Sequence, residues 1–346
     1  MKVAFLVRSM EDSSSRYRAL QFVPFLKEKG VDVCVLSRQR RWRDKLKLYN
    51  TLDQYDIVVI FRKLFTPVEF WYIRRKARKV IYDLDDAVMY RSSGSTPSTS
   101  FSRWLRFSYM MKRVDAVIAG NEFLKSVVLR YNDKVVILPT TIDLSRYSMK
   151  EATDPTSHMT IGWMGSNSTL EYLKPIIPAI ENIHQRHPDV QFEIVCDNFL
   201  DNVNVPVIKK RWTPEEEEMD LRSFDIGIMP LEDDLWSRGK CALKILQYYG
   251  VGLPVVCSPV GINREIVKDG VNGFWARDER EWEEKLETLI EDKGLRRQMG
   301  IKGRRTVEEY YSLEVNAPRL LSVMKEVLEK GQGNRVMEKT IAMNPR

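Results

Sequence analysis

Two lysines and a glutamine between residues 230 and 261 have the types and spacing to bind a diphosphate. Lys240, Lys244 and Gln247 are four and three residues apart, so a helix that begins near Lys240 would carry them on one face. The ammonium groups and the helix N-terminus attract phosphate charge, and the amide can hydrogen-bond a ribose hydroxyl. The pattern predicts a nucleotide site, although an amphipathic helix with a solvated lysine face fits the same spacing.

A serine-bearing loop is a second candidate for phosphate binding. The segment Gly165-Ser166-Asn167 follows a short apolar run at residues 160–164. Its glycine permits close approach of a ligand, its serine and amide can donate hydrogen bonds, and Ser168 or Thr169 can cap a helix that begins near Leu170. We interpret the loop as a phosphate cradle. A helix cap that binds no ligand is the alternative.

A third set of polar residues lies in the N-terminal half of the chain. Asp83 and Asp85 end a predicted strand, where they could orient an acceptor hydroxyl or accept its proton. Ser14 and Arg16 follow the first predicted strand and could contact a phosphate or the acceptor. An Asp-x-Asp pair would also suit a hard cation, so the residue pattern alone leaves a metal site open.

The elements that position these residues are strands and helices in alternation. Strands are predicted at residues 2–8, 31–36, 56–61, 79–82, 115–119 and 134–138, and again at 160–164, 191–195, 205–208, 225–229 and 254–257. Near-continuous Val, Ile and Leu runs separated by helices are typical of parallel strands that are buried on both faces. The chain is therefore predicted to be an α/β protein with two doubly wound domains, which bind ligands at the carboxyl ends of their strands.

The chain of 346 residues is long enough for two domains. We predict an N-terminal, acceptor-side domain at residues 1–150 and a nucleotide-sugar-binding domain at residues 151–312, joined by a polar linker at Met149–His158. Residues 279–293 and 313–330 are predicted amphipathic helices. The last helix and tail, residues 313–346, are expected to pack back towards the N-terminal domain.

Residues 246–258, Leu-Gln-Tyr-Tyr-Gly-Val-Gly-Leu-Pro-Val-Val-Cys-Ser, resemble the donor-binding segment of a known enzyme family. That family comprises the retaining GT-B glycosyltransferases of family 4, also called glycosyl transferases group 1. The segments at residues 261–273 and 134–143 are similar to the family as well. The resemblance implies the GT-B fold, two Rossmann-like doubly wound domains facing across a cleft. It also implies a nucleoside-diphosphate sugar as donor, transfer with retention, and no metal or other cofactor.

The sequence departs from the family at two glutamates of its motif, which fall at Gly239 and Gln247. Gln247 can still hydrogen-bond a ribose, whereas Gly239 offers only its backbone. Asp233, Asp234 and Ser237 are the candidate substitutes for the side chain that holds the donor sugar, with Asp234 preferred. Because the family's Arg and Lys pair after the first strand of the second domain is also missing, Arg238 and Lys240 are the preferred neutralisers of the diphosphate.

The resemblance also places the nucleobase near the turn at residues 209–212. Trp212 could stack on the base or pack on its neighbours. Thr213, Pro214 and Glu216 form a predicted capping box at the helix start that follows. Together with the phosphate-binding candidates, these residues make up the predicted donor site.

The charge of the chain is unevenly distributed. Residues 1–150 hold 29 Lys and Arg against 15 Asp and Glu, whereas the remainder holds 26 against 33. Basic and aromatic segments at residues 38–49, 70–79 and 102–113 carry much of this excess, a composition that suits anionic lipid. We expect a peripheral membrane contact and no nucleic-acid partner, since no nucleic-acid-binding motif accompanies the charge. Four scattered cysteines and no membrane-spanning run predict a cytoplasmic protein, and the peripheral contact would then be with the inner face of the membrane.

The sequence thus predicts a glycosyltransferase with a lipid-linked or cell-envelope glycan as acceptor. Asp83, Asp85 and Lys240 are its candidate catalytic residues. A nucleotide-sugar-binding protein without activity is the main alternative, because both family glutamates are missing. A sugar-nucleotide epimerase on the same fold is the less favoured alternative, because no histidine occurs before His158 and acid–base residues are sparse.

Overall fold

The computed structural model of the chain describes residues 1–150, 158–200 and 203–341. Most of the predicted linker, residues 151–157, lies outside them. The chain divides into two compact units. The first unit comprises residues 1–140, 239–241 and 313–346, and the second comprises residues 141–238 and 242–312. The chain therefore enters the second unit after Thr140, before the predicted boundary at residue 150.

The first unit is built on a parallel sheet with the strand order β2-β1-β3-β4-β5-β6. Its strands are β1 Lys2–Val7, β2 Asp32–Ser37, β3 Ile57–Phe61, β4 Val80–Leu84, β5 Ala116–Ala119 and β6 Val135–Ile137. Alternate residues of β1 face opposite sides, and Val3, Phe5 and Val7 join the core that also contains Leu320 and Met324 of the last helix. Burial on both faces explains the continuous apolar runs.

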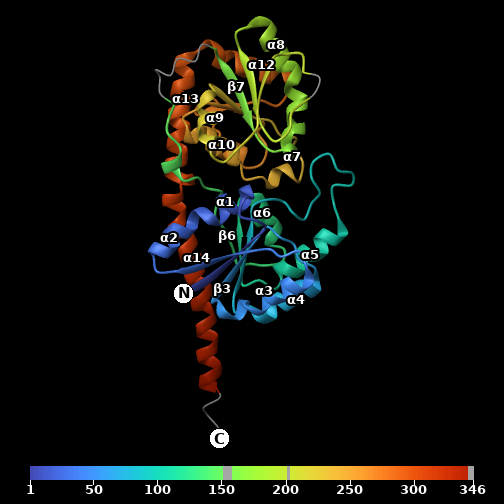
Figure 1. Cartoon of the computed structure of the whole chain (residues 1–346), viewed down its shortest axis with the longest axis vertical. Helices are drawn as coiled ribbons and strands as arrows, with labels where there is room; N and C mark the ends of the chain where they lie inside the picture. The colour runs from blue at the N-terminus through green and yellow to red at the C-terminus, as the bar shows by residue number, and fades with distance from the viewer. Residues whose placement is uncertain (151–157, 201–202, 342–346) are drawn as a thin grey trace. The chain divides into compact units, whose positions relative to one another are not determined.

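Helices cover both faces of the first sheet (Figure 1). On one face, α14 Leu313–Ile341 packs near α2 Val23–Glu28 and the short helix η1 Leu20–Phe22. The helices α3 Trp42–Asn50, α4 Pro67–Lys76 and α5 Phe101–Met111 lie side by side and form a separate group. The remaining helices of this unit are α1 Ser13–Arg18 and α6 Glu122–Val128. The three basic segments of the sequence thus correspond to α3, α4 and α5.

The second unit repeats the architecture with the strand order β12-β11-β10-β7-β8-β9, again parallel. Its strands are β7 Thr160–Met164, β8 Gln191–Val195, β9 Val207–Lys210, β10 Ile226–Met229, β11 Val255–Cys257 and β12 Gly273–Trp275. Its helices are α7 Asn167–Leu170, α8 Ile177–Arg186, α9 Glu217–Ser223, α10 Leu243–Gly250, α11 Asn263–Ile266, α12 Glu279–Glu291 and α13 Lys293–Thr306. Its core is formed by one sheet face against α8 and α12.

The predicted fold class is confirmed, since both sheets are parallel and covered by helices. In each sheet the strand order reverses once, between β1 and β3 in the first unit and between β7 and β10 in the second. Loops that leave the carboxyl ends of such neighbouring strands diverge and leave room for a ligand. The candidate residues follow β1 and β4 in the first unit and β7 and β10 in the second.

Candidate active site

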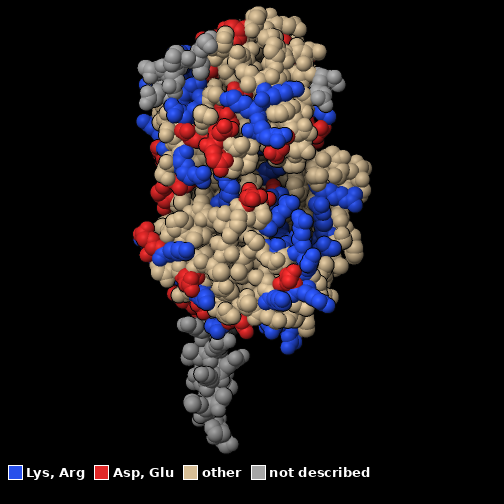
Figure 2. All heavy atoms as spheres, viewed as in Figure 1, with Lys and Arg blue, Asp and Glu red and all other residues tan. Residues whose placement is uncertain are grey.

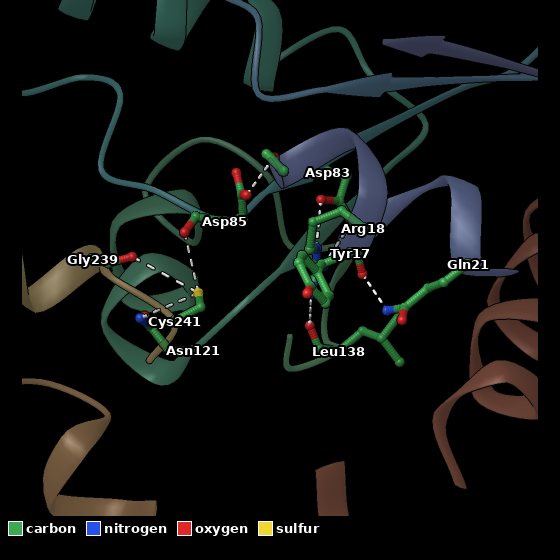
Figure 3. Close-up of polar contacts among 10 residues, drawn as sticks. Tyr17, Arg18, Gln21, Asp83, Asp85, Asn121, Leu138, Gly239 and Cys241 are labelled. Carbon is green, nitrogen blue, oxygen red and sulfur yellow. Dashed lines mark hydrogen bonds and ion pairs between the residues drawn. The ribbon is translucent and has the colours of Figure 1, made fainter. Parts of the chain in front are cut away.

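Asp83 at the end of β4 is held in a buried ion pair. The guanidinium of Arg18 donates to both of its carboxylate oxygens, at 2.9 and 2.7 Å, and to the backbone oxygen of Leu138 at 2.9 Å (Figure 3). Both side chains are about 2% exposed. Burial raises the pKa of Asp83, while the Arg18 charge favours its ionised form. Since both oxygens of Asp83 are occupied, its role in this structure is to anchor α1 to β4.

Asp85, two residues further on, is in a different position. One of its carboxylate oxygens accepts a hydrogen bond from the hydroxyl of Ser14. The other, Oδ1, is buried and has no hydrogen-bond partner among the described residues. A buried carboxylate oxygen without a donor is unfavourable until a donor is supplied. Of the two predicted aspartates, Asp85 is therefore the one able to accept a hydrogen bond from an acceptor hydroxyl.

Asp86 lies beside two cations. Arg62 forms an ion pair with the Asp86 carboxylate. Burial raises the pKa of Asp86, and the charges of Arg62 and Lys240 offset part of this rise. Arg62 follows β3 with a φ of 58°, a left-handed conformation that costs a non-glycine residue about 1 kcal/mol or more. The backbone nitrogen of Arg62 donates to the backbone oxygen of Asp83 at 2.9 Å. The loop after β3 thus brings a cation to the carboxyl end of β4.

Residues 239–241 belong to the first unit. A side chain at Gly239 would meet the Cβ of Ala87 at 2.4 Å, so only glycine fits there. The Cys241 thiol donates to the backbone oxygen of Asp85 at 3.2 Å, and the Asn121 side-chain amide donates to the backbone oxygen of Lys240 at 3.0 Å. Figure 3 shows Gly239 and Cys241 on the side of Asp85 and Asn121.

The prediction that Lys240, Lys244 and Gln247 share one face of a helix is wrong. Helix α10 begins only at Leu243, because Ala242 has a left-handed backbone with a φ of 52°. Gln247 is not on a solvated face either. It is 4% exposed, and its amide donates to the Tyr147 hydroxyl at 3.4 Å.

The loop after β7 does bring predicted donor residues together. Lys244 lies with its ammonium group 3.5 Å from the Thr169 hydroxyl and 5.3 Å from the centre of the Trp163 ring. Ser166 and Asn167 are exposed at the carboxyl end of β7. A cation and two polar side chains therefore lie close together at the point where the strand order of the second sheet reverses.

The local structure of this loop differs from the prediction in two respects. The helix begins at Asn167 with Ser166 as its N-cap, rather than near Leu170 with Ser168 or Thr169 as the cap. A Cβ on Gly165 would lie 2.2 Å from the Trp163 ring. Packing against the indole is thus sufficient to require glycine at this position.

Trp212 and Gln247 are joined through a buried glutamate. The indole N–H of Trp212 donates to Glu217 at 3.1 Å, and the Tyr147 hydroxyl donates to the other oxygen of Glu217 at 3.2 Å. Glu217 is 5% exposed. The predicted base-binding and ribose-binding residues therefore belong to one hydrogen-bond network. Helix α9 begins at Glu217, but the Thr213 hydroxyl does accept from the backbone of Glu216, as a cap would.

The remaining donor candidates lie in the loop after β10. Asp234 accepts from the backbone nitrogen of Ser237 at 2.7 Å and caps the short helix η5 Ser237–Gly239. Ser237 is 1% exposed and lies 3.3 Å from the Tyr172 hydroxyl. Arg238 is exposed and pairs with Asp233 at 2.7 Å. Asp234 and Ser237 thus stabilise the loop, and Arg238 presents a cation at its surface.

Sequence reasoning missed several residues at these sites. Arg18, Arg62 and Asn121 contact the predicted residues of the first unit, and Glu217 connects those of the second. The polar loop from Arg8 to Arg16 had indicated Arg16 as the cation that reaches the site. Arg16 instead lies 5.3 Å from the centre of the Tyr17 ring. Arg18 lies two residues beyond Arg16, at the end of α1, and no pattern in the sequence distinguished it.

Two parallel six-stranded sheets, each covered by helices on both faces, define the GT-B class of fold. Residues 158–292 match the family described as glycosyl transferases group 1. This match confirms the resemblance recognised at residues 246–258 and includes the candidates from Gly165 to Gln247. A search of curated proteins found no significant match.

Solved structures share the fold over nearly the whole chain. Anabaena HepE, in complex with UDP and glucose, is 16% identical over 94% of this chain and 99% of its own, with a TM-score of 0.70. Sucrose-phosphate synthase from Thermosynechococcus elongatus is 12% identical over 95% and 99%, with a TM-score of 0.72. A glycosyltransferase from Rickettsia africae is 14% identical over 94% and 98%, with a TM-score of 0.66.

Within residues 1–150, 158–200 and 203–341, no helix is both long enough and apolar enough to cross a bilayer.

Proposed function

We propose that the chain transfers a sugar from a nucleoside-diphosphate sugar to an acceptor hydroxyl. The observation that carries this proposal is the position of Lys244 beside the exposed Ser166 and Asn167 at the carboxyl end of β7. These residues fall within the part of the chain that matches the glycosyltransferase family. HepE has been solved with UDP-glucose, which is consistent with a donor of this kind.

The second unit would bind the donor. Lys244, Ser166 and Asn167 would hold the diphosphate, since an ammonium group and fixed polar donors compensate its charge as the leaving group departs. Arg238 would add a second cation if it exchanged Asp233 for phosphate. Trp212 would stack on the nucleobase, with its orientation set by the hydrogen bond from its N–H to Glu217.

The first unit would present the acceptor. Asp85 can accept the hydrogen of an acceptor hydroxyl at its unpartnered oxygen, which orients the hydroxyl and removes its proton as the new bond forms. Lys240, close enough to Asp86 to lower its pKa, would supply positive charge on the same side. Asp83 would act only by positioning, through Arg18 and α1. Retention of configuration is proposed from the family resemblance.

A lipid-linked acceptor and peripheral contact with anionic membrane belong to the same proposal. Large apolar side chains are exposed on the basic helices, including Trp42 on α3, Trp71 on α4 and Phe101 on α5, which is 84% exposed. Exposed aromatic rings beside cations favour a membrane interface. Binding to vesicles of anionic phospholipid should fall when Trp71 and Phe101 are replaced by serine. Oligonucleotide binding that falls in parallel would favour a nucleic-acid partner instead.

The proposed activity is tested with a panel of UDP, GDP, ADP and dTDP sugars. At least one should raise the melting temperature and be consumed, by transfer or slow hydrolysis, and Lys244→Met should weaken its binding about tenfold or more. Lys174→Met, which removes an exposed lysine from the same unit, is the matched control. Binding without any turnover would instead identify a nucleotide-sugar-binding protein, the alternative favoured by the buried Gly239 and Gln247.

A further inference from the structure

Four cations of the first unit lie near one another, since the charges of Arg38, Lys45 and Arg106 all act on the pKa of Lys63. Arg38 follows β2, Lys63 follows β3, Lys45 lies on α3 and Arg106 lies on α5. The backbone nitrogen of Arg38 donates to the backbone oxygen of Val7 at the end of β1. This hydrogen bond fixes Arg38 at the carboxyl edge of the sheet. The loop after β3 is tied to α5, because the backbone nitrogen of Phe65 donates to the sulfur of Met110, one turn beyond Arg106. The four residues are called the β2–β3 cation cluster below.

A single buried carboxylate accompanies this cluster. Glu69 on α4 is 6% exposed and accepts hydrogen bonds from the Lys45 ammonium group at 2.9 Å and from the Tyr49 hydroxyl at 2.7 Å. Burial raises the pKa of Glu69, but the hydrogen bonds from Tyr49 and Lys45 and the charge of Arg38 lower it further, so it stays ionised. Glu69 therefore forms its ion pair with Lys45, and its charge also acts on Arg38 and Lys63 without a direct contact among the described residues.

The other three cations have no carboxylate partner. Among the described residues, Arg38, Lys63 and Arg106 form no ion pair, and the Nε of Arg38 is buried without a hydrogen-bond acceptor. Burial and the charge of Arg38 lower the pKa of Lys63 more than the charge of Glu69 raises it, and the charge of Arg106 lowers it further. Partly buried cations that repel one another are unfavourable unless an anion joins them. Figure 2 shows Lys and Arg gathered over the part of the first unit that carries α4 and α5, with few acidic groups among them.

The number of charges selects the class of anion. One carboxylate or sulfate monoester would neutralise only one of the three remaining cations. A diphosphate carries two to three negative charges and several oxygens, which match the forked donors of two arginines and the ammonium group of a lysine. Large apolar side chains are exposed on α3 and α5, which carry Lys45 and Arg106, and on α4, which carries Glu69.

We propose that Arg38, Lys63 and Arg106 form a binding site for a diphosphate ester in the first unit, distinct from the donor site of the second unit. If the proposed transferase function holds, the diphosphate is part of the acceptor, and the cluster identifies the acceptor class as a phosphorylated one. The binding itself does not depend on that function. The diphosphate group is common to a lipid-linked carrier and a free phosphorylated compound.

Site-specific acetylation of lysines tests the proposal. The whole protein is treated with limiting acetic anhydride, and the labelling rate of each lysine is measured by mass spectrometry with and without inorganic pyrophosphate. Saturating pyrophosphate should slow the labelling of Lys63 about tenfold, because a bound anion raises its pKa and covers it. The exposed Lys47 on α3 should be unaffected. Farnesyl diphosphate in detergent is the second probe. If farnesyl diphosphate protects Lys63 at a lower concentration than pyrophosphate does, the ligand is a lipid carrier. If both protect Lys63 at the same concentration, the ligand is a free phosphorylated compound.

UDP separates this proposal from the proposed function. Because UDP is itself a diphosphate ester, the comparison is one of concentration: UDP should protect Lys244 at a much lower concentration than it protects Lys63, so either site can fail while the other is seen. Arg38→Gln should abolish the protection of Lys63 by pyrophosphate, and Lys47→Met should preserve it. Without ligand, Lys63→Met should melt no lower than the wild type, since it removes an unpaired cation. The proposal is overturned if neither diphosphate protects Lys63, if Lys47 is protected equally, or if Lys63→Met melts markedly lower.

Discussion

The two units differ in how they hold the polar residues at the carboxyl ends of their strands. In the first unit, Arg18 and Asp83 compensate each other inside the protein, both about 2% exposed. In the second unit, the comparable ion pair, Asp233 with Arg238, has half-exposed side chains, 52% and 45%. A buried pair fixes the backbone around a site, whereas an exposed pair can be exchanged for a ligand. Of these two pairs, the one in the first unit thus positions its surroundings rigidly, and the one in the second unit can be exchanged for a ligand.

The largest effect should follow from breaking the buried pair. Arg18→Met would leave the Asp83 carboxylate and the Leu138 oxygen without donors, and should lower the free energy of unfolding by about 3–5 kcal/mol. Arg238→Met, in the exposed pair, should change it by less than about 1 kcal/mol. Urea unfolding of both variants measures the difference. Equal losses would remove the contrast between the units.

A smaller effect, on activity alone, is expected at Asp85. Asp85→Asn should reduce the transfer rate about a hundredfold, since the amide oxygen is a poor proton acceptor, while the affinity for the nucleotide sugar stays within about twofold. Ser14→Ala removes one hydrogen bond to Asp85 and should cost only about three- to tenfold. Rates and donor affinities of both variants are compared with the wild type. A loss of donor affinity with unchanged turnover would place Asp85 outside the acceptor site.

The third prediction concerns the missing family glutamate. Gln247→Glu would bring a second carboxylate to the Tyr147 hydroxyl, which already donates to Glu217, and should destabilise the protein by about 1–2 kcal/mol. Adding Glu217→Gln to this variant should recover part of the loss. The free energies of unfolding of the single and double variants measure the coupling. Faster transfer by Gln247→Glu at unchanged stability would show that the charge itself is needed.

Much of the fold was predictable because it depends on local patterns. Continuous apolar runs and intervening helices predicted eleven strands that the structure contains, within a few residues at each end. The short strand β12 and helix α13 were not predicted as elements of their own. Their sequences carry weak signals: β12 has only three residues, and α13 is rich in Arg, Lys and Gly.

The site was less predictable because its partners are far apart in sequence. Arg18 and Asp83 are separated by 65 positions, and Gln247 and Tyr147 by 100. No periodicity reveals such pairs. The start of α10 was missed because Ala242 takes a left-handed backbone that its residue type disfavours. Lys244 and the Ser166 loop were separate diphosphate-binding candidates in the sequence, and the structure places Lys244 next to Thr169 of that loop.

The most direct test of the account is the binding of nucleoside-diphosphate sugars to the wild type and to Lys244→Met. One sugar of the panel should raise the unfolding free energy of the wild type by about 2.7 kcal/mol at a concentration of 100 times its Kd. At the same concentration Lys244→Met should gain about 1.4 kcal/mol, as a tenfold weaker affinity implies. Equal stabilisation of both proteins, or none by any nucleotide sugar, would contradict the proposed donor site.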